Sequence, residues 1–529
     1  MSGPPTPARR IARAALGSSL TTIWSALLGF FTAPFLIHDL GSASYGLFAL
    51  IGLVSSYMAN LEFGFGNTAV RFLAHARARR DAADEQAVIS NALLIFVPAA
   101  ALAFALPFFG APFVVSHFAH GPRSLHRVFL TAVRLGAAIV AIALITSLWS
   151  AALQALGRFA WLINTNWIFG TMLSASSVLI AATGGGILNV LRAQLAILSF
   201  LSLADMIALS RSTSAHLVPR MHSQTFREMA GFARQTFAAG LGSQVLAQGP
   251  PAILAGYGTT AELAFFALPR TVMQQVDGLV GSTSLGFFPF TSAASAEPDK
   301  TRVIALFRSN MRLTLLLLAP FSCFIAAFAH PLLVAWIGGT FAERTTLPLQ
   351  FFAGASLFWG LGSAPADVAR GFGRPGLVSA YTAAGAITAL ALSFLLIPDY
   401  GASGAACAVC VSGAFITVPF IFVSASEVLG LRAIDLLKSL IGPITALALA
   451  AAISVGGALL ADTFLSAVLT GTALAVLYLS FVARRVLWRR EREVLKSLLV
   501  RSPSPQTPDA EARRSGTADD DNPNLEQSR

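Results

Sequence analysis

The eighth apolar segment of this sequence carries a polar stripe suited to an anionic, hydroxyl-rich ligand. Arg270, Gln274 and Asp277 are spaced i, i+4 and i+7, which places them on one face of a helix. The preceding segment adds Gln244 and Gln248, which are four residues apart. An arginine fork binds phosphate or carboxylate groups through two parallel hydrogen bonds, and amides bind hydroxyl groups. These residues therefore predict a cationic, amide-lined binding cavity.

Charged side chains inside a membrane span cost roughly 2.5 to 3.5 kcal/mol on insertion scales, so each one is a candidate for function. Arg134, in the fourth segment, joins the predicted binding residues, and Glu62 and Asp277 are candidates for ion coupling. Each has a structural alternative. Arg270 and Asp277 can belong to a buried ion network, Arg134 can extend to the membrane interface, and Glu62 can pair with a loop arginine.

Other reactive residue types predict no catalytic, metal or cofactor site. Arg192 is expected to extend to the membrane interface, and Asp205 and Asp367 are ambiguous in the same way as Glu62. The histidines lack metal-ligand spacing, and the pair Cys407 and Cys410 lies in a run of small residues that suits helix packing. No phosphate-binding loop of the G-x-x-x-x-G-K-[ST] type is present.

The elements that must position these residues are about fourteen long apolar segments, from one near residues 17–37 to one near 464–482. A helix needs about 20 apolar residues to cross the hydrocarbon core, and the chain is 55% hydrophobic with 12% charged residues. The sequence thus predicts an all-α polytopic membrane protein. Its net charge of +11 is spread over loops, which argues against nucleic acid as a partner and favours topology and contact with membrane lipids.

Positive charges concentrate in every second gap between the apolar segments, with Arg123, Arg127 and Arg344 as exceptions. Basic loops stay on the cytoplasmic side, so both termini are predicted to be cytoplasmic. That arrangement requires an even number of spans. The tail after Val482 reads as a basic amphipathic helix followed by a disordered segment.

The chain also repeats itself. At an offset of 217 residues Gly41 aligns with Gly258, and at an offset of 216 residues Gly157 aligns with Gly373. Six spans separate matched positions, so the copies share one orientation: two parallel-repeat six-helix lobes around a central cavity, plus two C-terminal helices. The predicted segments are the N-terminus (1–16), N-lobe (17–210), linker (211–235), C-lobe (236–425), last two spans (426–483) and tail (484–529).

The segment from Pro34 to Ala74 resembles the opening of bacterial oligosaccharide and O-antigen flippases, in the multidrug/oligosaccharidyl-lipid/polysaccharide exporter superfamily. The matching elements are a proline in the first helix, an L-G-x-x-x-Y-G turn, an acidic-aromatic-glycine run and an alanine and arginine behind it: Pro34, Leu40-Gly41, Tyr45-Gly46, Glu62-Phe63-Gly64, Ala69 and Arg71. The family more often has aspartate where this chain has Glu62. The pairs Gly157-Arg158 and Gly373-Arg374 also resemble family loops.

This resemblance implies a transporter, not an enzyme, that moves an undecaprenyl-pyrophosphate-linked oligosaccharide across the bacterial inner membrane to the periplasmic leaflet for surface polysaccharide (O-antigen, lipopolysaccharide) synthesis. A polysaccharide polymerase and glycosyltransferases are the expected partners. The alternatives are a lipid II flippase, a multidrug and toxin extrusion antiporter, and a membrane glycosyltransferase or polymerase. No loop between segments exceeds about 25 residues, which disfavours a catalytic domain. The sequence does not identify the glycan, the coupling ion or the oligomeric state.

Overall fold

The computed structural model describes residue 24 and residues 27–38, 41–118, 126–213, 216, 218–281, 300–459 and 464–482. The predicted N-terminal segment 1–16 and the predicted tail 484–529 lie outside these residues. The described part of the chain is helical and contains no strand. A helix satisfies its own backbone hydrogen bonds, which is what an apolar segment requires in lipid.

Eight described helices are long and apolar enough to cross a membrane. They are α2 (Ser42–Ala59, continued by the 3₁₀ turn η1, Asn60–Glu62), α4 (Ala82–Phe118), α5 (His126–Ala155), α6 (Phe159–Ala182), α7 (Gly186–Ser210), α11 (Thr301–Ile337), α14 (Pro375–Leu429) and α15 (Ala433–Leu459). α14 is two helices joined at Gly401, whose φ of 53° and ψ of −128° are not helical. Its two halves therefore count as two crossings.

The remaining crossings are less uniformly apolar or shorter. They are the helix Leu27–His38, α8 (Ser223–Tyr257), α9 (Thr260–Gly281), α12 (Gly339–Leu361) and α16 (Phe464–Phe481). With α14 counted twice, the described part of the chain supplies fourteen crossings, as predicted. The short helices α3 (Phe65–Arg79) and α13 (Ser363–Gly371) lie between them.

Backbone geometry confirms the internal repeat. Gly157 and Gly373 both adopt a left-handed conformation, with φ of 72° and 71°. Each is followed by an arginine whose amide donates to the carbonyl five residues earlier, Arg158 to Leu153 at 2.9 Å and Arg374 to Ala369 at 2.8 Å. This is the Schellman pattern that ends a helix and favours glycine. The two GR pairs therefore make the same helix stop at equivalent points of the two lobes.

A second pair of helix boundaries, at Gly41 and Gly258, shares one hydrogen-bond pattern across the repeat. The Gly41 amide donates to the Ile37 carbonyl at 3.0 Å, and the Gly258 amide donates to the Leu254 carbonyl at 2.7 Å. Both bonds run to the residue four positions earlier, and both glycines lie between consecutive helices. The two glycines differ in backbone conformation, however, since φ is 81° at Gly41 and −95° at Gly258.

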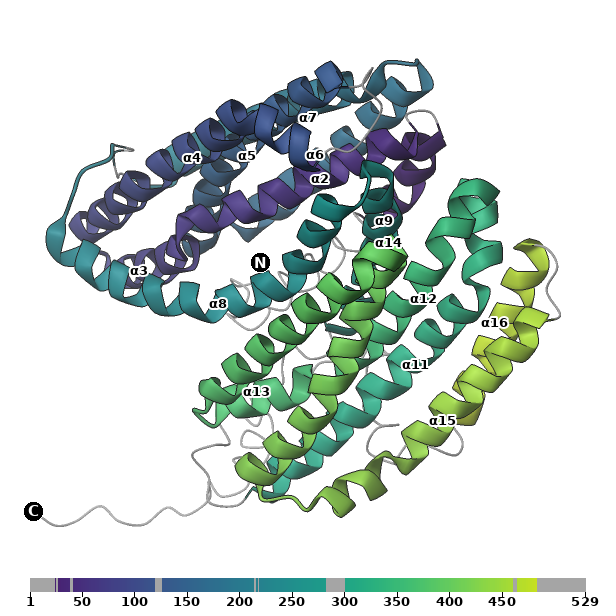
Figure 1. Cartoon of the computed structure of the whole chain (residues 1–529). Coiled ribbons are helices and arrows are strands. Elements are labelled where there is room, and N and C mark those ends of the chain that lie inside the picture. The colour runs from purple at the N-terminus through teal and green to yellow at the C-terminus, as the bar shows by residue number, and fades with distance from the viewer. Residues whose placement is uncertain are drawn as a thin grey trace, which may run out of the picture. The chain divides into compact units, whose positions relative to one another are not determined.

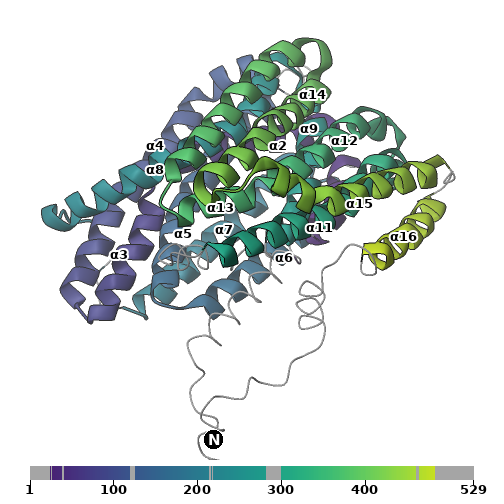
Figure 2. The same cartoon turned by 90° about the horizontal axis from the view of Figure 1, so that it is seen from below.

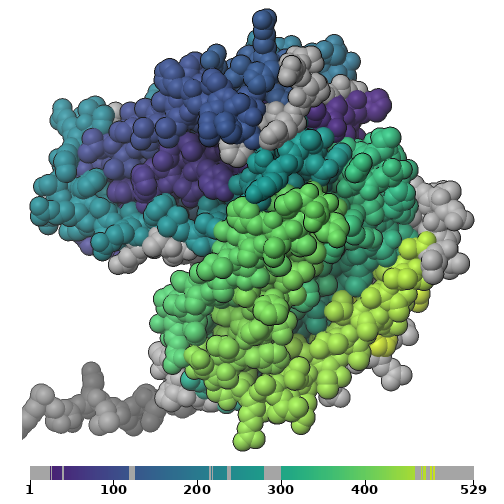
Figure 3. Space-filling view, viewed as in Figure 1, coloured from purple at the N-terminus to yellow at the C-terminus, as the bar shows by residue number. Residues whose placement is uncertain are grey.

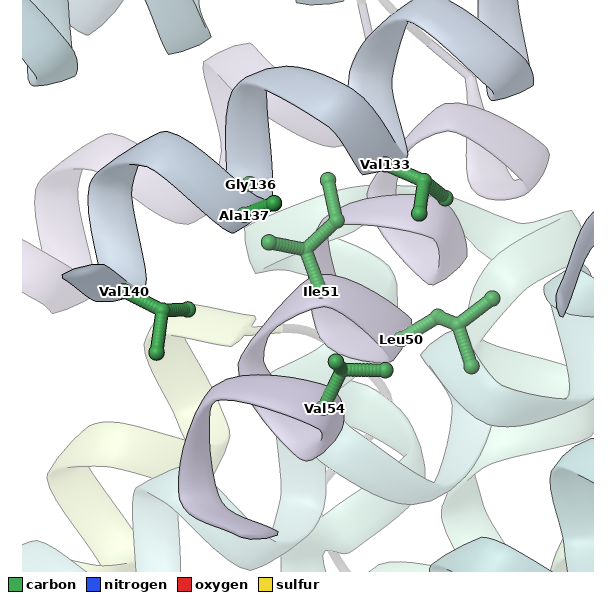
Figure 4. A pocket seen from close by; sticks show the side chains of 7 residues that line it. All are labelled: Leu50, Ile51, Val54, Val133, Gly136, Ala137 and Val140. Atoms are coloured by element: carbon green, nitrogen blue, oxygen red, sulfur yellow. The ribbon is translucent and has the colours of Figure 1, made fainter. Parts of the chain in front are cut away.

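Each lobe has its own helix packing, which Figures 1 and 2 show. In the N-lobe α5 packs on α4 and α7, and α6 packs on α7. In the C-lobe α11 packs on α12 and α15, and α14 packs on α8 and α12. Figure 4 shows Leu50, Ile51 and Val54 of α2 facing the α5 residues around Gly136. A Cβ on Gly136 would lie 2.7 Å from the Ile51 Cγ2 atom, so glycine permits this close approach.

The two lobes meet chiefly where α2 packs on α9. A Cβ on Gly46 of α2 would overlap the Thr260 carbonyl oxygen at the start of α9. Leu47 and Leu50 of α2 share one buried core with Leu263 and Phe266 of α9. In Figure 3 teal atoms, the colour of α9, lie between the purple and blue N-terminal helices and the green C-terminal ones. Gly46 therefore sets how closely the lobes approach at this crossing.

The linker between the lobes is fixed to the N-lobe. The Gln86 side chain accepts from the His216 amide at 2.5 Å and donates to the His216 carbonyl at 2.8 Å. The Asn91 side chain holds His222 in the same way, at 2.9 and 3.1 Å. α8 begins at Ser223, inside the segment 211–235 that the sequence assigned to the linker. The first turns of α8 pack on α3 and α4, which explains their less apolar composition.

Candidate functional site

The predicted polar stripe lies on one face of α9. Gln274 and Asp277 are exposed and Arg270 is half-buried, whereas Phe266 and Met273, which lie on the same side of α9, are buried in the core. α9 packs against α2 and α12. α9 is not among the eight described helices that are long and apolar throughout, because its charged and amide side chains lower its mean hydropathy. The stripe therefore lies beside buried core residues, and its exposure increases from Arg270 to Asp277.

Arg270 and Asp277 do not pair with each other. They are seven residues apart on α9, a rise of roughly 10 Å. Among the ion pairs of the described residues, none involves either side chain. Asp277 lies within interaction range of the Ser356 hydroxyl on α12. The described side chains provide no hydrogen bond or carboxylate to the Arg270 guanidinium, so it is available to an anionic ligand.

The two glutamines on α8 adjoin α2. The Gln244 side-chain amide donates to the Ser56 carbonyl at 3.0 Å, and the Tyr57 hydroxyl donates to the Gln248 carbonyl at 3.0 Å. Gln244 thus has a structural contact between the lobes, while the Gln248 side chain has no hydrogen bond to a described residue. Of the two, Gln248 keeps its full amide for a ligand.

Arg134 lies apart from the α8 and α9 residues in the pattern of contacts. It is exposed on α5, and its guanidinium carbon lies 5.2 Å from the centroid of the Phe108 ring on α4. A cation held over an aromatic ring in this way is stabilised by the ring quadrupole. No hydrogen bond, ion pair or ring contact among the described residues joins Arg134 to the stripe.

Glu62 lies at the end of η1 and lines a cavity of about 510 Å³ within the N-lobe. None of the ion pairs among the described residues involves Glu62, so the alternative of a pair with a loop arginine has no counterpart there. The cavity walls come from α3, α5, α6 and α7. Glu62 is therefore the carboxylate among the residues that line this cavity.

Asp205, Asp367 and Arg192 each have a partner within the protein. Asp205 is 1% exposed and accepts from the Trp161 Nε1 atom at 2.7 Å. Asp367, on the short helix α13, pairs with Arg370 at 3.2 Å, and burial raises the pKa of its carboxyl while the Arg370 guanidinium opposes that shift. The Arg192 guanidinium donates to the Asn189 side-chain oxygen at 2.9 Å.

The other polar residues of the N-lobe cavity were not predicted from the sequence. They are hydroxyl and amide side chains: Asn67, Thr146, Ser147, Ser150, Gln154 and Asn166. The signal was present, because Thr146, Ser150 and Gln154 recur every four residues on an otherwise apolar helix. Serine and threonine can donate hydrogen bonds to their own helix backbone in a membrane, so a stripe of these residues is weaker evidence for a binding site than a charged stripe.

Comparison with known proteins identifies related sequences and folds. The family model described as "Polysaccharide biosynthesis protein" matches residues 40–345, whereas no curated protein matches the sequence. The lipid II flippase MurJ, in an inward closed conformation, superposes with a TM-score of 0.71 at 16% identity, over 89% of this chain and 99% of that chain. An inward-facing multidrug resistance MATE family transporter of the MOP superfamily gives 0.65 at 12% identity, over 79% and 99%. A MOP superfamily transporter from Pyrococcus furiosus gives 0.57 at 12% identity, over 79% and 96%.

Proposed function

Because the chain belongs to the polysaccharide biosynthesis protein family, we propose that it is a flippase for a lipid-linked oligosaccharide. It would carry an undecaprenyl-pyrophosphate-linked glycan from the cytoplasmic to the periplasmic leaflet of a bacterial inner membrane, with both termini in the cytoplasm. The fold that it shares with flippases and multidrug transporters supports transport over catalysis.

The observation that carries this proposal is Arg270 on α9. A guanidinium that no described side chain neutralises is costly inside a membrane unless a ligand supplies the counter-charge. A pyrophosphate supplies two adjacent groups that a planar fork binds through paired hydrogen bonds. The glycan is expected to contact the neighbouring amides of Gln274 and Gln248, which have no hydrogen bond to a described residue. Asp277 is proposed to couple transport to an ion.

A lipid II flippase is the second candidate, supported by the similarity in fold to MurJ. Lipid II also carries a saccharide on a lipid pyrophosphate, so Arg270 would serve both substrates. Export of a cationic drug is disfavoured, because Arg270 and Arg134 would repel such a ligand. Complementation separates the two flippase activities. A strain that lacks its oligosaccharide flippase should regain surface glycan with this protein, and a strain depleted of its lipid II flippase should not regain growth.

Substitution of Arg270 tests the proposed binding role directly. Arg270→Gln should abolish surface glycan while the protein still accumulates in the membrane, and Arg270→Lys should restore only part of the export, because a point charge lacks the bidentate fork. Poor accumulation of Arg270→Gln, rescued together with export by adding Asp277→Asn, would instead indicate a structural ion network. The double variant should therefore accumulate normally and export no glycan.

A further inference from the structure

The N-lobe cavity differs from the α9 stripe in its chemistry. Its lining contains one carboxylate, on Glu62, three amides, three hydroxyls and no cationic side chain. The Glu62 carboxylate would repel a pyrophosphate there, and the lining has no guanidinium or ammonium group to offset that repulsion. The cavity volume of about 510 Å³ lies in the range of roughly 300 to 1,000 Å³ that is typical of small-molecule sites. The cavity is thus suited to an uncharged ligand or an uncharged part of one.

The polar groups that line the cavity are free to bind such a ligand. Among the described residues, no hydrogen bond or ion pair engages the side chains of Glu62, Asn67, Gln154 or Asn166. Amides offer both donors and acceptors, and a carboxylate offers acceptors alone. A ligand with several hydroxyl groups can satisfy all of them, because each hydroxyl both donates and accepts.

The hydroxyl side chains of the wall present acceptors to the cavity. The Thr146 hydroxyl donates to the Ile142 carbonyl at 2.8 Å, and the Ser147 hydroxyl donates to the Leu144 carbonyl at 2.8 Å. Their protons are therefore used by their own helix, which leaves oxygen lone pairs for a ligand. Together with Glu62, they make the lining richer in acceptors than in donors. This balance favours a ligand that donates hydrogen bonds.

Asp205, which does not line the cavity itself, connects three of the helices that form its walls. Its carboxylate on α7 accepts from Trp161 on α6 at 2.7 Å and from Ser150 on α5 at 3.5 Å. Three of the helices that line the cavity are thereby tied at one buried residue. Phe169 on α6 adds an aromatic wall, on which the apolar C–H face of a sugar ring can pack.

We infer that this N-lobe cavity is the glycan subsite of the transporter, distinct from the pyrophosphate site at Arg270. Glu62, Asn67 and Asn166 bind hydroxyls of the sugar, and Asp205 is a positioning residue that acts through Ser150 and Trp161. The inference rests on the proposed function, because it takes a lipid-pyrophosphate-linked glycan as the substrate. The lipid and pyrophosphate would be bound by other parts of the molecule.

Binding of two matched probes to the purified full chain in lipid nanodiscs tests this assignment. The plain probe is farnesyl pyrophosphate. The glycosylated probes are farnesyl pyrophosphates whose terminal phosphate carries glucose, galactose or N-acetylglucosamine. In the unaltered protein at least one glycosylated probe should bind more tightly than farnesyl pyrophosphate. Glu62→Gln and Asn166→Leu should each remove roughly ten- to a hundredfold of that added affinity, the value for hydrogen bonds to a charged or buried group.

Asn164→Leu is the matched control, because Asn164 lies on the same helix two residues away and does not line the cavity. It should leave the affinity for every probe unchanged, and the cavity variants should bind plain farnesyl pyrophosphate as the unaltered protein does. Equal affinity for plain and glycosylated probes would overturn the inference while leaving the Arg270 proposal standing. Loss of sodium binding in Glu62→Gln with unchanged glycan affinity would instead assign the cavity to a cation. If Arg270→Gln binds farnesyl pyrophosphate as tightly as the unaltered protein does, the proposed function itself would be wrong.

Discussion

Removing the indole donor to Asp205 should destabilise the N-lobe by an amount that can be worked from the structure. Asp205 is 1% exposed, and its 2.7 Å bond from the Trp161 Nε1 atom is much shorter than its 3.5 Å bond from the Ser150 hydroxyl. Hydrogen bonds to charged groups contribute about 1.5 to 3 kcal/mol. Trp161→Phe leaves the buried carboxylate with only the longer bond. We therefore expect the free energy of unfolding to fall by about 2 kcal/mol.

A double-mutant cycle in detergent micelles isolates this contact from the loss of ring area. Asp205→Leu removes the acceptor of both hydrogen bonds, so loss of the Trp161 donor should cost little in that background. The double variant should show a coupling energy of at least about 1 kcal/mol. Trp359→Phe is the control, because the Trp359 indole donates to the neutral Val409 carbonyl at the longer distance of 3.4 Å.

Equal losses of stability for Trp161→Phe and Trp359→Phe would refute this reasoning, since the loss would then reflect ring area alone. A coupling energy near zero would refute it as well. Either result would also remove the role of Asp205 in holding the walls of the N-lobe cavity.

Three further predictions concern helix contacts and topology. Gly46→Val should destabilise the packing of α2 on α9 by about 1 to 3 kcal/mol, whereas Gly52→Ala on the same helix, where a Cβ meets nothing within 4 Å, should cost nothing in thermal unfolding. Gly373→Ala should cost roughly 1 to 2 kcal/mol because its φ is 71°, and Gly376→Ala, in helical backbone, should not; equal effects would contradict the shared helix stop. Reporter fusions after Arg80, Arg227 and Ser502 should report cytoplasm and those near Ser42, Gly185 and Gly401 periplasm; a periplasmic C-terminus would exclude the proposed orientation.

The fold was predictable from the sequence because the bilayer imposes simple requirements. Apolar length predicted the crossings, and the offset between Gly157 and Gly373 predicted a repeat that both helix stops confirm. The boundary at α8 was less predictable. Its first turns pack on the N-lobe and not in lipid, so their polarity resembled that of a linker.

The candidate site was predictable only in part. Spacing placed Arg270, Gln274 and Asp277 on one helix face. It could not show that no described side chain forms a hydrogen bond or ion pair with Arg270, or that the Gln244 side chain contacts α2. The N-lobe cavity was not predicted, because residues from four helices form it and their convergence depends on tertiary packing. Asp205 illustrates the same limit, since its partner Trp161 lies on another helix.

Translocation by the purified protein tests the central claim most directly. The full chain is reconstituted in vesicles with a fluorescent undecaprenyl-pyrophosphate-linked oligosaccharide, and the fraction of glycan exposed to an added glycosidase is followed with time. The account predicts that the unaltered protein exposes glycan from the inner leaflet at a rate well above that of empty vesicles, and that Arg270→Gln reduces this rate to the empty-vesicle level. Equal rates with the unaltered protein and with Arg270→Gln would contradict it.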